Sequence, residues 1–465
     1  SRRQRQMCIR DSMKIEWLHK SGSPRLILIF AGWSTDSHFY SHISHEGWDV
    51  AVVSGYSDLS FQANILDNYS TVSVFAWSMG VYVASHVLTN DQVSLAIAIN
   101  GTEFPAHDQL GIPVAIFEGT ASTLTDRNLT KFRRRMTGKQ YESIKESLDS
   151  CCSDINLLRS ELDFILDKGR FSGYKTGSLR WHRVYASTED LIFPYQAQIN
   201  AWQDNPFHPE IITLNSPHYV DLYPIIKGVL PSEQKIGGRF KKAITTYDTQ
   251  ASAQRKIAEC LTNLCPECSL DNIVEIGPGT GLFTKMIAKK CRPKHMTFVD
   301  LYELDHFNVA PIEDYIIADA ENWIEREANN NPKSMDAIVS ASAIQWFSNP
   351  RRFFKNASKL IKPGGIFLCS TFLPGNLSEL KEIAPFGLIY RTREEIEDLL
   401  KDCFKEFVLS EKTFPITFTS PRETLLHLRH TGVGGSTHSS LPIGELLSIT
   451  PSTLTYRPLF ILAKA

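Results

Sequence analysis

Short, almost uninterrupted apolar runs are the feature that most restricts how this chain can fold. In the first half they occupy residues 26–31, 71–76, 95–100, 114–117, 184–186 and 211–214, and in the second half residues 272–276, 296–299, 337–340 and 365–369. Runs of this length between turn-rich stretches predict strands that are buried on both faces of a parallel sheet. Helical spacing interrupts the first series from residue 126 to about residue 169. We therefore expect two α/β domains, the first with an inserted helical lid.

The expected domain limits follow from where the pattern stops and restarts. Residues 231–238 are short, polar and Gly-rich, which is typical of a linker. The first domain is thus expected over residues 13–230, with its lid at about 125–183, and the second domain over 239–465. Residues 1–12 match neither pattern, and we interpret them as a non-native leader rather than as a basic targeting arm.

Composition excludes several classes of function. The 465 residues carry a formal net charge of −2, so the chain as a whole has no basic surface for nucleic acid. No apolar run approaches the roughly 20 residues that span a bilayer, and no signal peptide is recognisable. Cys265 and Cys268 lie close together, but no second pair completes a zinc site, so no metal is expected. The scattered cysteines favour a cytoplasmic location.

A strand-turn-helix pattern around Ser78 indicates a serine nucleophile. The stretch 74–80 ends an apolar run, and helical spacing begins at Val81. This is the nucleophile elbow G-x-S-x-G with Ala76 in place of the first glycine. Small residues are needed there because strand and helix approach closely. A helix-capping serine is the alternative interpretation.

An acid and a histidine follow in the order that this hydrolase class requires. Asp190 comes after the run 184–186, and His218 comes after the run 211–214. His218 would take the proton of Ser78, and Asp190 would orient the imidazole. Glu189 and His208 are the rival candidates. The oxyanion donors would be the backbone N–H groups of two residues, Met79 and Trp33.

The predicted lid differs in charge from the rest of its domain. Between residues 125 and 183 basic residues outnumber acidic ones, whereas the remainder of the first domain is strongly acidic. Arg133, Arg134 and Arg135 are the centre of this basic segment. They favour docking of an acidic partner at the mouth of the site. A solvated helix face is the alternative.

A glycine-rich turn in the second half predicts a cofactor site. Glu275 precedes three glycines, and two acids follow later strands, as expected for S-adenosylmethionine rather than for a dinucleotide. The predicted cofactor residues are Glu275, Gly277, Gly279, Gly281, Asp300, Asp319 and Ala320. Methyl transfer to a carboxylate needs no general base, because that acceptor is already an anion at neutral pH. Proximity and in-line approach would carry the catalysis.

The second half resembles the BioC-type malonyl-acyl-carrier-protein O-methyltransferases. The similarity extends over nearly all of residues 237–465, through the segments 238–248, 275–281, 340–347, 362–365 and 454–458. This resemblance implies a Rossmann-like, class I methyltransferase that uses S-adenosylmethionine. It also implies that Tyr247, Gln345 and Trp346 lie at the entrance for cofactor or substrate.

The first half resembles the BioG-type pimeloyl-acyl-carrier-protein methyl ester esterases. The matching segments are 30–33, 76–80, 98–102, 190–194 and 218–219, with Val220 where the family pattern has proline. The resemblance implies an α/β-hydrolase and a biotin-synthesis role. One half would mask the malonyl carboxylate as a methyl ester, and the other would remove the ester after two rounds of elongation. The implied partner is acyl carrier protein.

Two other interpretations remain open from the sequence. The two halves could act on unrelated small-molecule or polyketide substrates, or one of them could be a degenerate binding module. All the proposed site residues are present in both halves, which argues against degeneracy.

Overall fold

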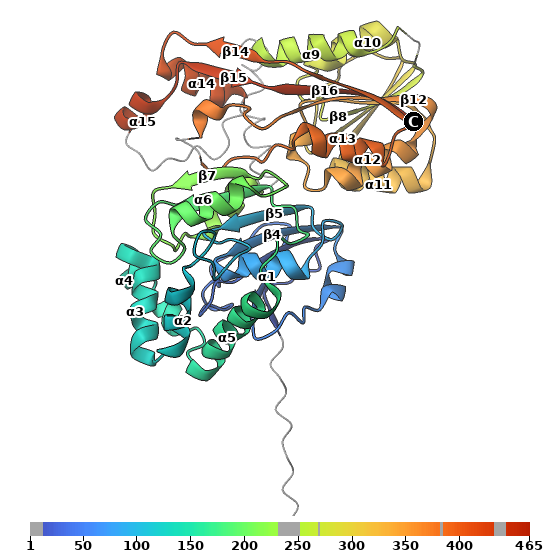
Figure 1. Ribbon diagram of the computed structural model, residues 1–465. Helices are drawn as coiled ribbons and strands as arrows, with labels where there is room; N and C mark the ends of the chain where they lie inside the picture. Colours follow the sequence, from blue (N-terminus) through green and yellow to red (C-terminus); the bar gives the residue numbers. More distant parts are fainter. Residues whose placement is uncertain (1–12, 231–251, 268–269, 382–384, 432–442) are drawn as a thin grey trace, which may run out of the picture. The chain divides into compact units, whose positions relative to one another are not determined.

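The computed structural model describes residues 13–230, 252–267, 270–381, 385–431 and 443–465. The chain divides into two compact units, residues 1–223 and 224–465 (Figure 1). The division falls inside helix α7 (Leu222–Val229). The expected domain limit at residue 230 therefore stays a prediction.

The first unit is built on a seven-stranded sheet with the order β1-β3-β2-β4-β5-β6-β7. The strands are β1 (Lys14–His19), β2 (Arg25–Phe30), β3 (Asp49–Ser54), β4 (Thr71–Trp77), β5 (Leu95–Ile99), β6 (Arg183–Ser187) and β7 (Glu210–Leu214). Strand β1 is antiparallel to β3, and the other pairs are parallel. Every residue of β3, β4 and β5 is buried, as expected for central parallel strands.

Helices follow the strands of the first unit. They are α1 (Met79–Val87), α2 (Val114–Ser122), α3 (Asp126–Thr137), α4 (Tyr141–Asp149), α5 (Ile155–Ser172), α6 (Tyr195–Gln203) and α7, with short 3₁₀ turns at Ala63–Asn68 and Gly138–Gln140. Helices α3, α4 and α5 form the inserted segment, so the predicted helical spacing is confirmed there. Thr125 and Asp154 begin α3 and α5 by accepting hydrogen bonds from backbone N–H groups of the first turn.

One strand prediction for this unit is wrong, and one strand was missed. Residues 114–117 form the start of α2 rather than a strand, and Ile116 is half exposed, so the run is not buried on two faces. Strand β3 was not among the predicted runs, although all of its residues are buried. It pairs with β2 on one side and β1 on the other.

The second unit contains a seven-stranded sheet with the order β10-β9-β8-β11-β12-β16-β13. Its strands are β8 (Asn272–Ile276), β9 (His295–Asp300), β10 (Ile312–Ile317), β11 (Met335–Ala341), β12 (Ile361–Phe372), β13 (Glu406–Glu411) and β16 (Pro458–Lys464). The first five strands of that order are parallel, whereas β16 is antiparallel to both β12 and β13. A separate two-stranded antiparallel sheet pairs β14 (Phe414–Thr417) with β15 (Thr453–Tyr456).

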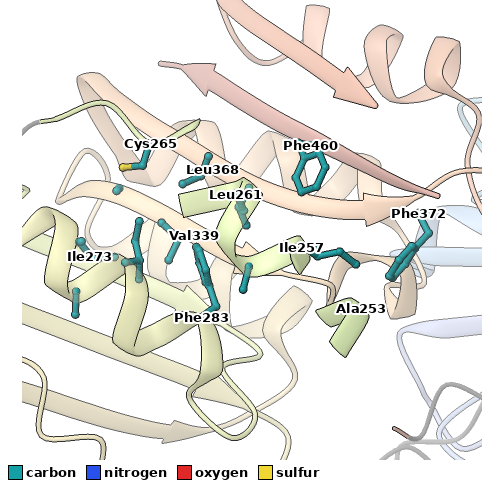
Figure 2. Packing of buried hydrophobic residues seen from close by; sticks show 14 of the residues in the cluster. Ala253, Ile257, Leu261, Cys265, Ile273, Phe283, Val339, Leu368, Phe372 and Phe460 are labelled. Carbon is teal, nitrogen blue, oxygen red and sulfur yellow. The ribbon is translucent and has the colours of Figure 1, made fainter. Parts of the chain in front are cut away.

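Helices contribute to two apolar cores of this second sheet. One core includes α9 (Ser252–Leu264) and α10 (Leu282–Cys291), and Figure 2 shows Ala253, Ile257 and Leu261 of α9 packed among side chains of the sheet strands. The other core includes α11 (Ala320–Asn330), α12 (Pro350–Leu360) and α13 (Arg393–Lys401). The remaining elements are α14 (Pro421–Thr431), α15 (Ile443–Ile449) and 3₁₀ turns at Ile344–Trp346 and Ser378–Leu380. Within the described ranges, no helix is long and apolar enough to cross a membrane.

Candidate functional sites

Ser78 stands in a sharp turn between β4 and α1. Its φ of 58° lies in the left-handed region, where a non-glycine residue is strained. The turn is crowded: a Cβ atom on Gly80 would lie 2.4 Å from the Phe30 carbonyl oxygen, and one on Gly101 would lie 2.2 Å from the Ser78 carbonyl oxygen. Glycine is therefore required at both positions. The strained turn thus places Ser78 directly between the end of β4 and the start of α1.

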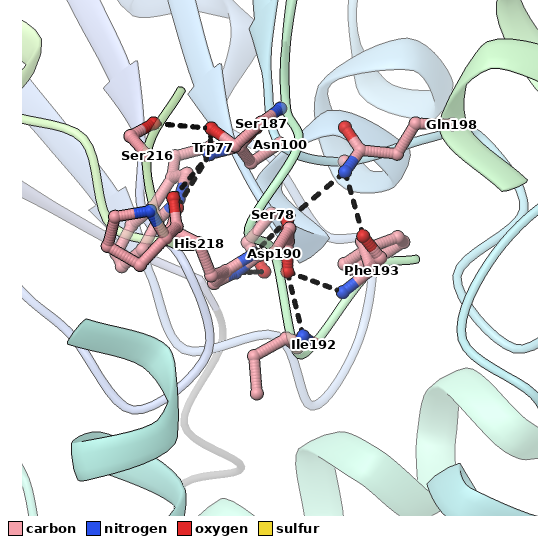
Figure 3. Close-up of polar contacts among 12 residues, drawn as sticks. Trp77, Ser78, Asn100, Ser187, Asp190, Ile192, Phe193, Gln198, Ser216 and His218 are labelled. Carbon is pink, nitrogen blue, oxygen red and sulfur yellow. Dashed lines mark hydrogen bonds and ion pairs between the residues drawn. The ribbon is translucent and has the colours of Figure 1, made fainter. Parts of the chain in front are cut away.

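His218 connects Ser78 to Asp190. Its Nε2 atom lies 2.9 Å from Ser78 Oγ, and its Nδ1 atom lies 2.7 Å from Asp190 Oδ2 (Figure 3). All three residues are buried. The histidine ring also stacks on Phe193, with 5.9 Å between ring centroids. The three residues predicted as a triad thus form one continuous hydrogen-bonded chain, whereas the rivals Glu189 and His208 are exposed.

The second oxygen of Asp190 is also bound. Asp190 Oδ1 accepts hydrogen bonds from the backbone N–H groups of Ile192 (2.7 Å) and Phe193 (2.9 Å). Gln198, a buried residue of α6, donates from Nε2 to Asp190 Oδ2 at 3.1 Å. The carboxylate is therefore fixed at both oxygens and can hold the imidazole in one orientation. No motif in the sequence points to Gln198, because its contact with Asp190 depends on how α6 packs against the loop that contains this acid.

The two predicted oxyanion donors come from two different segments: Met79 directly follows Ser78, and Trp33 follows β2. Met79 is the first residue of α1, and the N–H groups of a first helical turn have no acceptor within the helix. Trp33 lies in the loop after β2 and is buried. Its indole Nε1 donates to the Leu158 carbonyl of α5 at 3.0 Å, and its ring meets Phe132 of α3 edge-on. Helices α3 and α5 therefore fix the position of this loop.

The three arginines of α3 that were predicted to dock a carrier protein do not share one environment. Arg133 is only 5% exposed and donates from Nη2 to the carbonyl oxygens of Ser34 (3.0 Å) and Cys152 (3.1 Å). The prediction that it docks a carrier protein is therefore wrong, because the helical spacing that exposes its neighbours turns this side chain inward. Arg134 and Arg135 are exposed, and Arg134 lies over the ring of Tyr141.

In the second unit, the turn between β8 and α10 contains the three predicted glycines. Gly277, Gly279 and Gly281 have φ values of 66°, 57° and 78°, which side chains with a Cβ atom rarely adopt. Gly277 and Gly281 are also crowded, by Ala343 and Phe307. By contrast, a Cβ atom on Gly279 would meet nothing within 4 Å. The backbone is therefore open toward a ligand at this middle glycine.

Glu275 supplies a buried carboxyl group beside that turn. Its Oε2 atom has no hydrogen-bond partner among the described residues. Burial, together with the negative charge of Asp300, raises the pKa of Glu275 to about 8. An unpaired buried polar atom is costly unless a ligand satisfies it. This atom and the open glycine fit a polar cofactor that lies across the carboxyl end of β8.

Asp300 and Asp319 are the two predicted cofactor acids that follow later strands. Asp300, at the end of β9, accepts a hydrogen bond from Gly279 N at 3.4 Å, and burial raises its pKa. Asp319 precedes α11, whose first residue is Ala320, and caps the helix by accepting from the N–H groups of Glu321 and Asn322. The cap fixes Asp319, and its role in cofactor binding stays a prediction.

The residues predicted at the entrance are only partly described. Tyr247 lies outside the described residues. Gln345 and Trp346 belong to the 3₁₀ turn Ile344–Trp346 and are half-buried. Gln345 donates to the Ser342 carbonyl oxygen, while its own Oε1 atom is buried without a hydrogen-bond partner among the described residues. After Glu275 Oε2, Gln345 Oε1 is thus a second buried acceptor without a hydrogen-bond partner among the described residues, and it lies in the turn after β11.

Sequence reasoning missed Glu321, which holds the segment after that turn. Glu321 is buried and accepts hydrogen bonds from the backbone N–H groups of Ser348 (2.8 Å) and Asn349 (2.7 Å). Burial and the nearby Asp319 raise its pKa to about 7. Its position two residues after Asp319 is weak evidence for a functional role, because polar residues are common in the first turn of a helix.

Cys268, which is close to Cys265 in the sequence, lies outside the described residues. Within the part of the chain that the structure describes, no group of three or more His, Cys, Asp or Glu side chains could hold a metal ion. Cys265 and Cys291 are buried with their sulfur atoms 3.4 Å apart. They pack between the ends of α9 and α10.

Family comparisons define the class of each unit. A methyltransferase domain family matches residues 247–402, in line with the Rossmann-like sheet and glycine turn, and the cofactor is S-adenosylmethionine. The pimeloyl-ACP methyl esterase BioG family matches residues 13–221. The chain thus combines a methyltransferase region with an esterase-family region.

Relatives assign the whole chain to one family. A malonyl-[acyl-carrier protein] O-methyltransferase of Bacteroides fragilis is 33% identical over 461 residues, which cover 94% of this chain and 92% of the relative. This chain therefore belongs to the malonyl-[acyl-carrier protein] O-methyltransferase family, and the resemblance inferred from its motifs is confirmed.

Two further matches each correspond to about half of the chain. The protein of the same description from Porphyromonas gingivalis is 35% identical over 247 residues, 49% of this chain and 93% of the relative. The crystal structure of BioG from Haemophilus influenzae is 30% identical, with a TM-score of 0.41, and covers 45% of this chain and 94% of its own.

Proposed function

We propose that this chain is a bifunctional enzyme of biotin synthesis. Its second unit methylates the free carboxylate of malonyl-acyl carrier protein with S-adenosylmethionine. Its first unit hydrolyses the methyl ester of pimeloyl-acyl carrier protein. The relative that matches 94% of the chain and the esterase family that matches residues 13–221 support this pair of activities.

The hydrogen-bonded chain of Ser78, His218 and Asp190 carries the esterase proposal. Ser78 Oγ attacks the ester carbonyl as His218 Nε2 accepts its proton, and Asp190 stabilises the imidazolium that forms. The backbone N–H groups of Met79 and Trp33 would bind the oxyanion. Methanol leaves with the proton from His218. Water then attacks the acyl-enzyme, again with His218 as base, and releases the free acid and Ser78.

An α/β-hydrolase fold is our proposal for the first unit. The strand order, one antiparallel strand at the β1 edge and the serine turn directly after β4 support it. Asp190 follows β6 and His218 follows β7, which is the chain order of that fold. The helices α3, α4 and α5 would form the lid over residues 125–183.

The methyltransferase proposal depends mainly on positioning. When bound, S-adenosylmethionine supplies an electrophilic methyl group. We propose that Glu275 and the glycine turn hold its methionine part, that Asp300 binds the ribose hydroxyls, and that Asp319 with Ala320 faces the adenine. Tyr247, Gln345 and Trp346 would line the entrance. The acceptor carboxylate has a reference pKa of about 4, so it is already ionised and needs no base. Alignment of this carboxylate with the methyl group would therefore supply the rate enhancement.

The two reactions have a common physical purpose. An ionised carboxylate is costly to bury in an apolar acyl-binding channel, whereas its methyl ester is not charged. Methylation therefore allows the growing acyl chain to enter elongation enzymes, and hydrolysis restores the acid. We propose that acyl carrier protein, which is acidic, docks on the exposed lid cations Arg134 and Arg135.

Both activities are measured on the full chain to test this proposal. We expect transfer of a labelled methyl group to malonyl-acyl carrier protein and release of methanol from pimeloyl-acyl carrier protein methyl ester. The chain should also restore growth without biotin to bacterial strains that lack either step. Failure of one activity with the other intact would reject the assignment of that unit alone.

A further inference from the structure

Asn100 occupies a strained, fully buried position directly beside the serine turn. It follows β5, has a φ of 44° and is 0% exposed. Asparagine is one of the few non-glycine residues that tolerate this left-handed backbone. Its chain neighbours contact the nucleophile: Ser78 N donates to the Ile99 carbonyl at 2.9 Å, and Gly101 packs against the Ser78 backbone.

The Asn100 amide binds both loops that carry the other triad members. Its Nδ2 atom donates to the His218 carbonyl oxygen at 2.7 Å and to Ser187 Oγ at 2.8 Å. Its Oδ1 atom accepts from Ser187 N at 2.9 Å. Ser187 ends β6, three residues before Asp190. Figure 3 shows these contacts converging around one side chain.

The contact to His218 is reinforced by a second donor. Trp77, the residue before Ser78, donates from its indole Nε1 to the same carbonyl oxygen at 3.0 Å. The carbonyl of His218 is therefore saturated by two side chains from neighbouring strand ends. These two hydrogen bonds help to fix the backbone of His218, and its two imidazole nitrogens contact Ser78 and Asp190.

We propose that Asn100 is a positioning residue of the esterase site, an inference that rests on the proposed esterase function. Only an amide satisfies this site, because it has two donors on one arm and an acceptor on the other. Aspartate would keep the acceptor for Ser187 N but would face the His218 carbonyl with an oxygen. An apolar side chain would leave two buried acceptors and one buried donor with a lost partner.

Loss of this amide should slow the chemical step and not substrate binding. Asn100 is fully buried and its amide contacts protein atoms. Small displacements between a nucleophile and its base can nevertheless cost about 100-fold in rate. We therefore expect Asn100→Gly, which suits the left-handed backbone, to lower kcat about 10-fold to 100-fold on a small methyl ester. KM should stay within about twofold of the wild-type value.

The experiment uses the full chain and two readouts of the same site. Steady-state kinetics on a small methyl ester give kcat and KM, and a fluorophosphonate probe reports the rate at which Ser78 is phosphonylated with loss of fluoride. Asn205→Gly is the matched control, because Asn205 is also buried in this unit but donates to Glu103. Methyl transfer by the same preparation shows that the second unit is intact.

Each result has one interpretation. Slow phosphonylation and low kcat in Asn100→Gly, with normal rates in Asn205→Gly, support the proposal. Wild-type rates in Asn100→Gly, or a raised KM alone, overturn it. If Asn100→Gly melts at a much lower temperature, the isosteric Asn100→Asp decides, since wild-type activity there would show that the donor to His218 is unnecessary. A wild-type chain that the probe does not label would instead refute the proposed esterase.

Discussion

The two candidate sites differ in how much of their chemistry is already assembled. In the first unit, each catalytic atom of Ser78, His218 and Asp190 is hydrogen-bonded to the next. In the second unit, Glu275 Oε2 has no partner among the described residues, and the space beside Gly279 is open. A site whose reactive groups belong to the protein can be complete in the chain alone. A site that receives its reactive group from a cofactor keeps polar atoms available for it.

The largest effect is expected from removing the nucleophile. Ser78→Ala should lower ester hydrolysis by at least about 10⁴-fold, because the histidine then has no hydroxyl to activate. Methyl transfer should stay at the wild-type rate, since it uses none of these residues. Both rates are measured on one preparation of the full chain. An active Ser78→Ala esterase would mean that the assembled triad is not the catalytic group.

The next effect concerns which acyl chain the esterase accepts. An unselective esterase would hydrolyse the product of the other unit, so we expect discrimination by length. Four additional buried methylenes at about 0.8 kcal/mol each give roughly 3 kcal/mol, or on the order of 100-fold in kcat/KM. The first unit, produced as residues 13 to about 231, should therefore prefer the pimeloyl methyl ester over the malonyl methyl ester on one carrier protein. Comparable rates would mean that timing or competition prevents the futile cycle.

In the second unit, Asp300→Ala should weaken cofactor binding. The loss of charge-assisted hydrogen bonds costs about 1.5–3 kcal/mol, which corresponds to roughly 10-fold to 100-fold in Kd. Ester hydrolysis serves as the control and should not change. Calorimetry with S-adenosylmethionine measures the effect, and an unchanged affinity would mean that Asp300 does not bind the ribose.

The lid arginines allow a smaller but more specific test. The double variant Arg134→Glu, Arg135→Glu should lower kcat/KM about 10-fold on the carrier-protein ester and little on a small ester, because steering acts only on the acidic macromolecule. Added salt should shrink the difference. Arg133→Ala is the contrasting variant: it should impair both substrates, since it removes hydrogen bonds that fix the loop at Ser34. Equal losses in the double variant would indicate a disturbed lid.

The smallest expected effect is a pH dependence of cofactor affinity. The pKa of Glu275 is raised to about 8, so its carboxyl is mostly neutral at pH 7. If the ionised form binds the cationic end of the methionine moiety, affinity should increase several-fold between pH 7 and 8.5 and level off above that. Calorimetric Kd values across this range test it. Glu275→Gln should bind more weakly and lose the slope, and a wild-type affinity that falls with pH would contradict the prediction.

Most residues of the first site could be predicted from short sequence motifs. Ser78, Asp190 and His218 each follow an apolar run, and parallel strands bring their carboxyl ends to one edge of the sheet. Burial decided what the pattern could not. Glu189 and Asp190 are adjacent in sequence, but only Asp190 is buried and accepts from His218. Burial also separates Arg133 from its exposed neighbours Arg134 and Arg135, which the run of three arginines in the sequence does not reveal.

Other features depend on packing between distant segments. Residues 114–117 have the composition of a buried strand, but they begin a helix whose outer face includes the half-exposed Ile116. The Asn100 amide binds the His218 carbonyl 118 positions away, and the Gln198 amide binds Asp190 eight positions away. No sequence motif indicates such side-chain contacts. In the second unit, the glycines and Glu275 were visible in one motif, whereas Glu321 was not.

The aromatic enclosure of His218 has a spectroscopic consequence. The ring is stacked on Phe193 and lies 5.3 Å from Trp77, centroid to centroid. Its Nδ1 atom lies 2.7 Å from the buried Asp190 carboxylate, so in the tautomer that the triad requires it carries a hydrogen-bonded proton. Exchange of that proton with water should be slow, so it should give a resolved proton resonance far downfield in the NMR spectrum. Such a line would report the tautomer of the free enzyme directly and would follow the imidazole through each inhibitor complex without any added label.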